Sequence, residues 1–243
     1  MLRTFKADLH IHTCLSPCAD LEMSPKAIVA RAQMEELDII GICDHNSAEN
    51  VAAVRAAAAG CNVSVLPGLE ITSQEEVHVL ALFAEPEPAA RMQEIVYGCL
   101  PGKNDEEAFG VQVVVNEEGE VLSFNDRLLI GASTLSIEEI VDNIHALDGL
   151  AIASHIDREG FSIIGQLGFI PENLELDALE ISPRIPYGEA LTRFTSHHPL
   201  TCGSDAHYLE DIGKGFTSLY MEEPTTREIK KALSFQFGRR VVH

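Results

Sequence analysis

Short runs of apolar residues, most of them followed by a polar or charged residue, alternate along the chain with longer stretches of helical character. Apolar runs of about four to eight residues are typical of buried strands, whereas the stretches between them carry helix-starting and helix-stopping residues. The strands that this pattern predicts are Lys6–His12, Asp38–Cys43, Val63–Leu66, Glu76–Phe83, Leu150–Ser154, Leu179–Ser182, Leu200–Gly203 and Gly215–Met221.

Capping residues indicate where several helices begin. Ser24 precedes a proline, which is typical of an N-cap followed by proline in the first helical turn. Ser136 and Glu139 have the spacing of a capping box, and Thr225 and Glu228 repeat that spacing near the end of the chain. The helices predicted in this way are 24–37, 48–59, 136–147 and a closing helix from Thr225.

The alternation of strands and helices favours a parallel sheet closed into a barrel, in which chemistry sits at the carboxyl ends of the strands. A chain of 243 residues with 46% hydrophobic composition can bury a large core, and we expect residues 1–243 to form one α/β domain. The stretch 86–134 departs from the pattern, because a helix-like piece (89–100) precedes a hairpin-like piece (111–124). We expect an insertion over the barrel mouth that serves as a lid or a dimer contact, with passive decoration as the alternative.

The balance of charge bears on possible partners. The chain carries 38 acidic against 17 basic residues, a formal net charge of -21, which disfavours long nucleic acid and anionic membranes. Since no apolar run has transmembrane length and Met1 leads directly into a strand, we expect a cytoplasmic chain. Six irregularly spaced cysteines fit reduced thiols, although Cys14 and Cys18 lie on the loop after the first strand, where they could contact a metal.

His10 and His12 lie two residues apart at the end of the first predicted strand. Side chains at this spacing share one face of a strand, so both imidazoles can bind one ion, with a hydrogen-bonded barrel rim as the alternative. Residues of ligand type also follow other apolar runs, and their common placement predicts a metal site at the carboxyl ends of the strands. These residues are Asp44, His45, Glu70, His78, His155, Asp205 and His207.

In the order of these motifs the chain resembles the PHP (polymerase and histidinol phosphatase) family of metal-dependent phosphoesterases. The resemblance spans about 5–240, is weak over 86–134, and implies a distorted (βα)7 TIM-like barrel with two to three divalent metal ions. Nitrogen and oxygen ligands together suit zinc, manganese or iron. The motifs that carry the resemblance are His10-x-His12, Asp44-His45, Glu70, His78, Ser154-His155 and Asp205-x-His207.

The resemblance also implies a ligand set for each ion. Asp8 and Asp44 resemble residues that orient ligand imidazoles from behind. The first set is His10, His12, Glu70 and Asp205. The second is Glu70, as a bridge, with His78 and His155. The third is Asp20, His45 and His207.

The ligand count predicts hydrolysis at phosphorus. Two ions about 3.5–4 Å apart lower the pKa of a bridging water to near neutrality, and the resulting hydroxide can attack a phosphate in line. Arg158 and Arg184 are candidates to clamp the phosphate, because a guanidinium offers two parallel donors; rim salt bridges are the alternative. A metal-bound water, Asp44 or a mobile histidine could protonate the leaving oxygen.

We expect the substrate to be a small phosphorylated metabolite. The resemblance offers histidinol phosphate, nucleotides such as 3′,5′-bisphosphates, and DNA ends, of which the acidic composition disfavours the last. An amidohydrolase-type hydrolase of a C–N bond is one alternative, but its frequent bridging lysine is missing, since no lysine lies between Lys26 and Lys103. A non-catalytic metal-binding regulatory module is the other, and it would be expected to have lost ligands.

Overall fold

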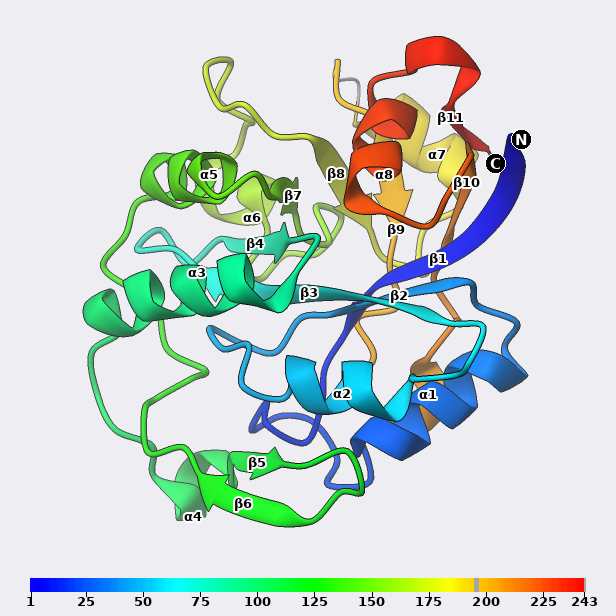
Figure 1. Ribbon diagram of the computed structural model, residues 1–243. Coiled ribbons are helices and arrows are strands. Elements are labelled where there is room, and N and C mark those ends of the chain that lie inside the picture. The colour runs from blue at the N-terminus through cyan, green and yellow to red at the C-terminus, as the bar shows by residue number, and fades with distance from the viewer. Residues whose placement is uncertain (195–196, 243) are drawn as a thin grey trace.

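The computed structural model describes residues 1–194 and 197–242 (Figure 1). Most of its strands form one nine-stranded sheet, in the order β11-β10-β1-β2-β3-β4-β7-β8-β9. The strands of this sheet are β1 (Arg3–Ile11), β2 (Ile39–Ile42), β3 (Ser64–Thr72), β4 (His78–Leu82), β7 (Leu150–Ala153), β8 (Ala178–Ile181), β9 (Leu200–Cys202), β10 (Thr217–Met221) and β11 (Arg240–Val242). A separate hairpin is formed by β5 (Val113–Val115) and β6 (Val121–Phe124).

The large sheet curls until the chain beyond β9 returns to β1. Ala206 forms a parallel bridge with Ile11. Its carbonyl accepts a hydrogen bond from the His12 N–H at 3.0 Å, and its own N–H donates to the His10 carbonyl at 3.3 Å. The sheet is therefore nearly closed, which confirms the expected α/β fold with a distorted, barrel-like sheet.

The sheet is mixed, so the expectation of a parallel sheet was wrong in part. β1, β2 and β3 are parallel to one another, as are β7, β8 and β9. However, β4 runs antiparallel to both β3 and β7, and β10 runs antiparallel to β1. The connection explains the reversal at β4, because residues 73–77 are too few for the crossover of about a dozen residues that parallel neighbours need.

Helices cover the outside of the sheet. Figure 1 shows α1 and α2 on one side of β1–β3, and α3 and α5 on another side, near β3, β4 and β7. Across the described residues, no helix combines the length and the apolar character that crossing a bilayer requires. The helices are α1 (Pro25–Met34), α2 (Val51–Ala57), α3 (Pro86–Cys99), α4 (Glu106–Phe109), α5 (Ile137–Ala146), α6 (Ile163–Leu167), α7 (Tyr187–Arg193) and α8 (Thr226–Leu233), with 3-10 turns at Leu209–Asp211 and Gln236–Gly238.

Both predicted capping boxes lie at helix starts, but only one of them forms in full. At α5, the Glu139 N–H donates to the Ser136 hydroxyl at 3.2 Å and the Ser136 N–H donates to the Glu139 carboxylate at 2.8 Å. At α8, the Glu228 N–H donates to the Thr225 hydroxyl at 3.3 Å, but the Glu228 carboxylate accepts from the Glu222 N–H at 3.0 Å. The second capping box is therefore half formed, because Glu228 has other partners.

Apolar side chains fill the interior of the barrel. Phe5, Ala7 and Leu9 of β1 point into it and pack with residues of α8, among them Ile229 and Leu233. Because Phe5 and Ala7 lie early in β1, α8 covers the amino end of that strand (Figure 1). The opposite end of the barrel, where β1 finishes, is left for polar side chains.

An irregularity in β1 aims the histidine pair. Its pairing with β2 shifts register between Asp8 and Ile11. Leu9 packs inside the barrel, yet Ile11, two residues later, packs outside against α1 and α2. A β-bulge reverses the alternation of side chains in this way, and here it turns His10 and His12 towards the mouth of the barrel.

The predicted helix and hairpin of 86–134 are both present, as α3 and as β5 with β6. The hairpin lies against the loop that follows β1, since the Val113 N–H donates to the Cys14 carbonyl at 3.2 Å. The Asn50 side chain also holds β5, donating to the Val113 carbonyl at 3.0 Å and accepting from the Val115 N–H at 2.9 Å. The role of the segment as a lid or dimer contact stays a prediction.

Candidate metal centre

Side chains of ligand type meet at one mouth of the barrel. His78 reaches this mouth from the first residue of β4, because β4 runs antiparallel to its neighbours. Glu70 lies within β3, which is longer than the sequence predicted. Most of the cluster is buried, and Asp205 and His207 are half-buried. The other members are His10 at the end of β1, His12 just beyond it, His45 after β2 and His155 after β7.

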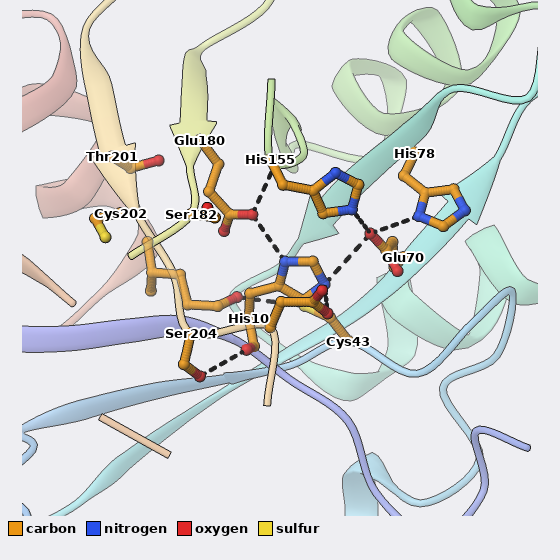
Figure 2. Close-up of polar contacts among 12 residues, drawn as sticks. His10, Cys43, Glu70, His78, His155, Glu180, Ser182, Thr201, Cys202 and Ser204 are labelled. Atoms are coloured by element: carbon orange, nitrogen blue, oxygen red, sulfur yellow. Dashed lines mark hydrogen bonds and ion pairs between the residues drawn. The ribbon is translucent and has the colours of Figure 1, made fainter. Parts of the chain in front are cut away.

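Glu70 is the centre of the cluster. Its side chain is 1% exposed and faces imidazoles on several sides (Figure 2). Its Oε1 lies 3.0 Å from Nδ1 of His78, 3.3 Å from Nε2 of His155 and 3.3 Å from Nε2 of His10. Its Oε2 lies 3.1 Å from Nδ1 of His45 and 3.6 Å from Nε2 of His12. One carboxylate can therefore bridge ions held by different imidazoles.

Asp205 is the second carboxylate of the cluster. Its Oδ1 lies 3.1 Å from Nε2 of His12 and 3.3 Å from Nε2 of His10, and its Oδ2 accepts a hydrogen bond from Arg158. Asp205 and His155 both have positive φ angles, of 49° and 28°. Such conformations are costly for residues with a side chain and cluster at functional sites.

Among the described residues, three groups have ligand atoms within 4.8 Å of one another. The groups are His10, His12, Glu70 and Asp205; then His45, Glu70 and His78; and finally His12, His45 and His207. The first is the expected set. In the second, His45 stands where His155 was expected, and in the third, His12 stands where Asp20 was expected.

Several buried atoms of this cluster make no hydrogen bond, although some imidazole nitrogens lie within ion-pair distance of Glu70, and this arrangement favours bound cations. Buried polar atoms normally have hydrogen-bond partners. A shared cation would satisfy nitrogens and oxygens that face one another, and imidazole with carboxylate suits zinc, manganese or iron. The atoms without hydrogen-bond partners are Nδ1 of His45, His78 and His155 and Oε1 of Glu70.

The charges of the cluster act on one another. Burial lowers the pKa of His10, but the carboxylates of Glu180, Glu70 and Asp205 outweigh burial and hold that pKa well above its ordinary value. For His12, burial and the neighbouring imidazoles hold the pKa well below its ordinary value. Burial raises the pKa of Glu70, yet the surrounding imidazoles bring it well below its ordinary value. Ionised carboxylates therefore face imidazoles across a short gap, which attracts cations.

Glu180 is a functional residue that sequence reasoning missed. It lies in β8, is 2% exposed, and its Oε1 is 2.9 Å from Nδ1 of His10 and accepts from the His155 N–H at 3.2 Å (Figure 2). A carboxylate at Nδ1 fixes the tautomer and leaves Nε2 for a metal. Gly203 makes room for it, because a Cβ there would lie 2.2 Å from the carboxylate. An acid within an otherwise apolar strand was the available signal.

Asp44 acts on an imidazole through a serine. It accepts hydrogen bonds from the Thr13 N–H at 2.7 Å and from the Ser16 hydroxyl at 2.8 Å, and that hydroxyl lies 2.9 Å from Nδ1 of His12. Its orientation of His12 is thus indirect, and Ser16 was not predicted. Asp44 is fully buried, and it is not among the described residues that line the cavity above the cluster. This placement disfavours proton donation by Asp44 and favours a positioning role.

Asp8 and Asp20 lie differently from what the resemblance implied. Asp8 accepts the N–H groups of Ser204 at 3.0 Å and Gly213 at 2.9 Å, so it holds backbone rather than an imidazole. Burial raises the pKa of Asp8 to about 6. Asp20 is exposed, and its carboxylate accepts from the Glu22 N–H at 2.8 Å. The structure therefore does not bring Asp20 into a metal-binding group.

A cavity of about 690 Å³ opens onto the cluster, a volume in the range of small-molecule sites. Both predicted arginines line it: Arg158 is 26% exposed in its side chain and Arg184 is exposed. Arg193 of α7 lines the same cavity and was not predicted. Phe161, also on the wall, stacks on His78 with ring centroids 4.7 Å apart. Cationic and aromatic side chains thus line the cavity above the cluster of ligand-type residues.

The sequence matches two family models. Residues 8–96 match the PHP domain, and residues 195–235 match the PHP-associated model. Over 82 residues the chain is 29% identical to a 5′-3′ exoribonuclease of Haemophilus influenzae, which covers 32% of this chain and 29% of that protein.

Solved structures show the same fold. A lesion-specific endonuclease of Pyrococcus furiosus, PfuEndoQ, matches with a TM-score of 0.74 and 19% identity over 98% of this chain and 58% of its own. An amidohydrolase of Chromobacterium violaceum matches with a TM-score of 0.58 and 18% identity, over 98% of this chain and 97% of its own. The chain thus spans a little over half of the endonuclease and less than a third of the exoribonuclease.

Proposed function

The chain belongs to the PHP domain family of metal-dependent phosphoesterases, and we propose that it hydrolyses a phosphate ester of a small phosphorylated metabolite. The observation that carries this proposal is the meeting of Glu70 and Asp205 with buried imidazoles on the floor of a cavity that has arginines on its wall. A phosphate ester fits this cavity, because metal ions at its base and arginines on its side can both bind phosphate oxygens.

Two to three divalent ions, zinc, manganese or iron, are the proposed cofactors. Ions bound at this site supply Lewis-acid chemistry and an activated water. The residues that would hold them are His10, His12, His45, Glu70, His78, His155, Asp205 and His207.

The remaining residues prepare the site and hold the substrate. Glu180 fixes Nδ1 of His10, and Ser16 with Asp44 fixes Nδ1 of His12, so both imidazoles present Nε2 to the carboxylates. Arg158 and Arg184 would bind the non-bridging oxygens of the phosphate and stabilise the charge that develops on them. Because Arg158 also bonds Asp205, it stands where the phosphate and the metal-binding floor meet.

A small substrate agrees with the cavity and the charge. The volume of about 690 Å³ suits a metabolite, and the net charge of -21 opposes a long polyanion. Nucleoside 3′,5′-bisphosphates and histidinol phosphate are therefore the first compounds to test.

A nucleic-acid substrate is the second candidate. It is favoured by the likeness to PfuEndoQ, which extends over 98% of this chain. The overall negative charge of the chain repels nucleic acid, so binding would depend on contacts between its phosphates and the arginines on the cavity wall.

Phosphate release from a panel of phosphorylated metabolites and short oligonucleotides tests the proposal. Protein purified without oxygen and freed of metal is reloaded with manganese, iron or zinc. We expect metal-dependent phosphate release that His155→Ala abolishes. Glu70→Gln should lower the rate of release by at least about a hundredfold, because replacing residues that only hydrogen-bond to metal ligands already lowers activity by about 10–100-fold.

The panel also separates the alternatives. Preference for oligonucleotides over every metabolite would support the second candidate. Cleavage of C–N substrates alone would support an amidohydrolase-type reaction. Absence of any turnover, in protein that holds two or more ions, would contradict the proposal and favour a regulatory metal-binding module.

A further inference from the structure

The wall of the cavity has an aromatic side as well as a cationic one. Phe161 lines the cavity, is 45% exposed, and stacks on His78 with an angle of 21° between the ring planes. Because His78 covers one face of this ring, the exposed remainder is the part that the cavity presents to a substrate.

The backbone holds Phe161 in a conformation that large residues rarely adopt. Its φ angle is 56°, and strain of this kind concentrates at binding and catalytic sites. Its carbonyl accepts the N–H of His78, the first residue of β4, at 2.9 Å. The space beside the preceding residue is open, since a Cβ at Gly160 would meet no heavy atom within 4 Å beyond its chain neighbours.

Short-range hydrogen bonds fix the loop that carries both Phe161 and Arg158. The Arg158 N–H donates to the His155 carbonyl at 2.9 Å, and the Ser162 hydroxyl donates to the Arg158 carbonyl at 2.5 Å. The same hydroxyl caps α6 by accepting the Gly165 N–H at 2.9 Å. The guanidinium proposed to bind phosphate and the aromatic ring thus belong to one ordered loop.

Ile130 adds a second apolar side chain to the cavity wall. The Asn46 amide donates to the carbonyls on both sides of Ile130, at 2.8 Å each, and accepts from the Thr72 N–H at 3.1 Å. Thr72 in turn pairs with His78 in the sheet. Ile130 therefore lies on the same side of the cavity as Phe161, where β3 and β4 meet.

We propose that Phe161 determines specificity by selecting phosphate esters whose organic group carries a planar aromatic ring. The inference rests on the proposed function and deepens it by naming the chemistry of the substrate beyond its phosphate. Arg184 and Arg193 follow β8, which β7 separates from β4 in the sheet. The wall can thus hold a phosphate on its arginines and a ring on Phe161. Stacked aromatic pairs gain more than burial of their area alone, so an aromatic ring is favoured over a saturated ring of similar size.

Two esters that differ only in their ring test this selection. Benzyl phosphate and cyclohexylmethyl phosphate both release a primary alcohol of similar acidity, but only the first has an aromatic ring. For the manganese-loaded chain we expect a kcat/KM about three- to tenfold higher for benzyl phosphate. Phe161→Leu should bring this ratio to about one, whereas Phe161→Tyr should keep it, because tyrosine retains the ring.

Phe169→Leu is the matched control. Phe169 is exposed and is not among the described residues that line this cavity, so its replacement should leave the ratio unchanged. Bound metal is counted in every variant, because Phe161 contacts His78. If Phe161 served only to hold that imidazole, Phe161→Leu would lower metal content or the turnover of both esters alike, and an unchanged ratio would overturn the proposal.

Binding of phosphonates gives a readout that needs no turnover. Benzylphosphonate and cyclohexylmethylphosphonate are not hydrolysed, and titration calorimetry of the metal-loaded chain compares their Kd values. We expect benzylphosphonate to bind about three- to tenfold more tightly, and we expect Phe161→Leu to remove the difference.

The outcomes separate this inference from the proposed function. Equal kcat/KM for the two esters in the wild type, or a preference that persists in Phe161→Leu, would overturn the inference and leave phosphate release standing. If no phosphate ester is hydrolysed at all, the function is contradicted and the phosphonates decide the inference. Tighter binding of benzylphosphonate that depends on Phe161 would then support it, and equal binding or none would overturn it.

Discussion

Glu70 at the mouth of the barrel and Glu228 at its other end are both buried glutamates, but they face different partners. Glu228, 6% exposed, accepts hydrogen bonds from Arg239 at 2.9 Å and Lys231 at 2.6 Å. Glu70, 1% exposed, has imidazoles around it. The charge of Glu228 is thus balanced within the chain by permanent cations.

The difference indicates which buried acids serve structure and which serve binding. Arginine and lysine keep their charge at every physiological pH, so Glu228 needs nothing from outside. Imidazoles can act as ligands only when neutral, and neutral imidazoles leave the charge of Glu70 unbalanced. A bound cation satisfies both conditions. Asp205 shares features of both acids, because it faces imidazoles of the cluster and also pairs with a permanent cation, Arg158.

The largest effect is expected from Glu180, whose carboxylate orients the His10 imidazole through Nδ1, the nitrogen that points away from the other ligands. Glu180→Gln should weaken zinc binding by about 10–100-fold, because the variant loses the carboxylate that fixes Nδ1 of His10. Competition with a chelator measures this affinity. Glu189→Gln, at an exposed position on the cavity wall, is the control. Equal zinc affinity in the two variants would remove Glu180 from the metal centre.

A smaller effect is expected from Arg158. Arg158→Ala should lower kcat/KM for a phosphate ester by about tenfold or more, because the phosphate loses charge-assisted hydrogen bonds. Metal content should not change, since the guanidinium carries no ligand atom. Steady-state kinetics with metal analysis checks both, and Arg55→Ala, which affects a remote pair with Glu85, is the control. Unaltered kinetics would leave Arg158 as a rim salt bridge.

The smallest effect on activity is expected at Glu228. Glu228→Gln should lower the free energy of unfolding by about 1–2 kcal/mol through lost charged hydrogen bonds, with zinc binding unchanged. Burial raises the pKa of Glu228, but Arg239 and Lys231 outweigh burial and lower it from 4.5 to about 2. Its stabilisation is therefore present above pH 4.5 and is lost as the pH falls through about 2.

Thermal unfolding of the metal-free chain at pH 7 and pH 3 checks this sign. The difference in Tm between wild type and Glu228→Gln should be larger at pH 7 than at pH 3. A difference that grows as the pH falls would contradict the assignment of Glu228 as a structural ion pair.

Local signals in the sequence predicted much of the fold. The starts of α5 and α8 follow from capping residues whose hydrogen bonds span only three positions. The start of α1 follows from Pro25 in the first turn, because the Ser24 side chain makes no capping hydrogen bond. Most strands of the large sheet were found because their apolar runs are continuous, whereas the short strand β11 was not predicted. The ligand residues were found because they lie at or near the ends of those runs. The boundary of β3 was missed, since Pro67 and Gly68 interrupt its pattern although both lie inside the strand.

Residues distant in the chain supplied what the sequence could not reveal. The contact of Glu180 with His10 joins positions 170 residues apart, and the hydrogen bond from the Asp20 N–H to the His207 carbonyl depends on where the chain returns after β9. Neither follows from spacing, because each requires the register of strands that meet only when the barrel closes.

The sequence by itself determined the kinds of ligand, their order and the strands that carry them, because side-chain chemistry and period-two geometry are local properties. Only the tertiary structure decided the reversed direction of β4, the bulge that aims His10 and His12, and the grouping of ligands around Glu70. These features depend on the path of the chain between strands, on hydrogen-bond register and on closure of the sheet, which are properties of the whole barrel.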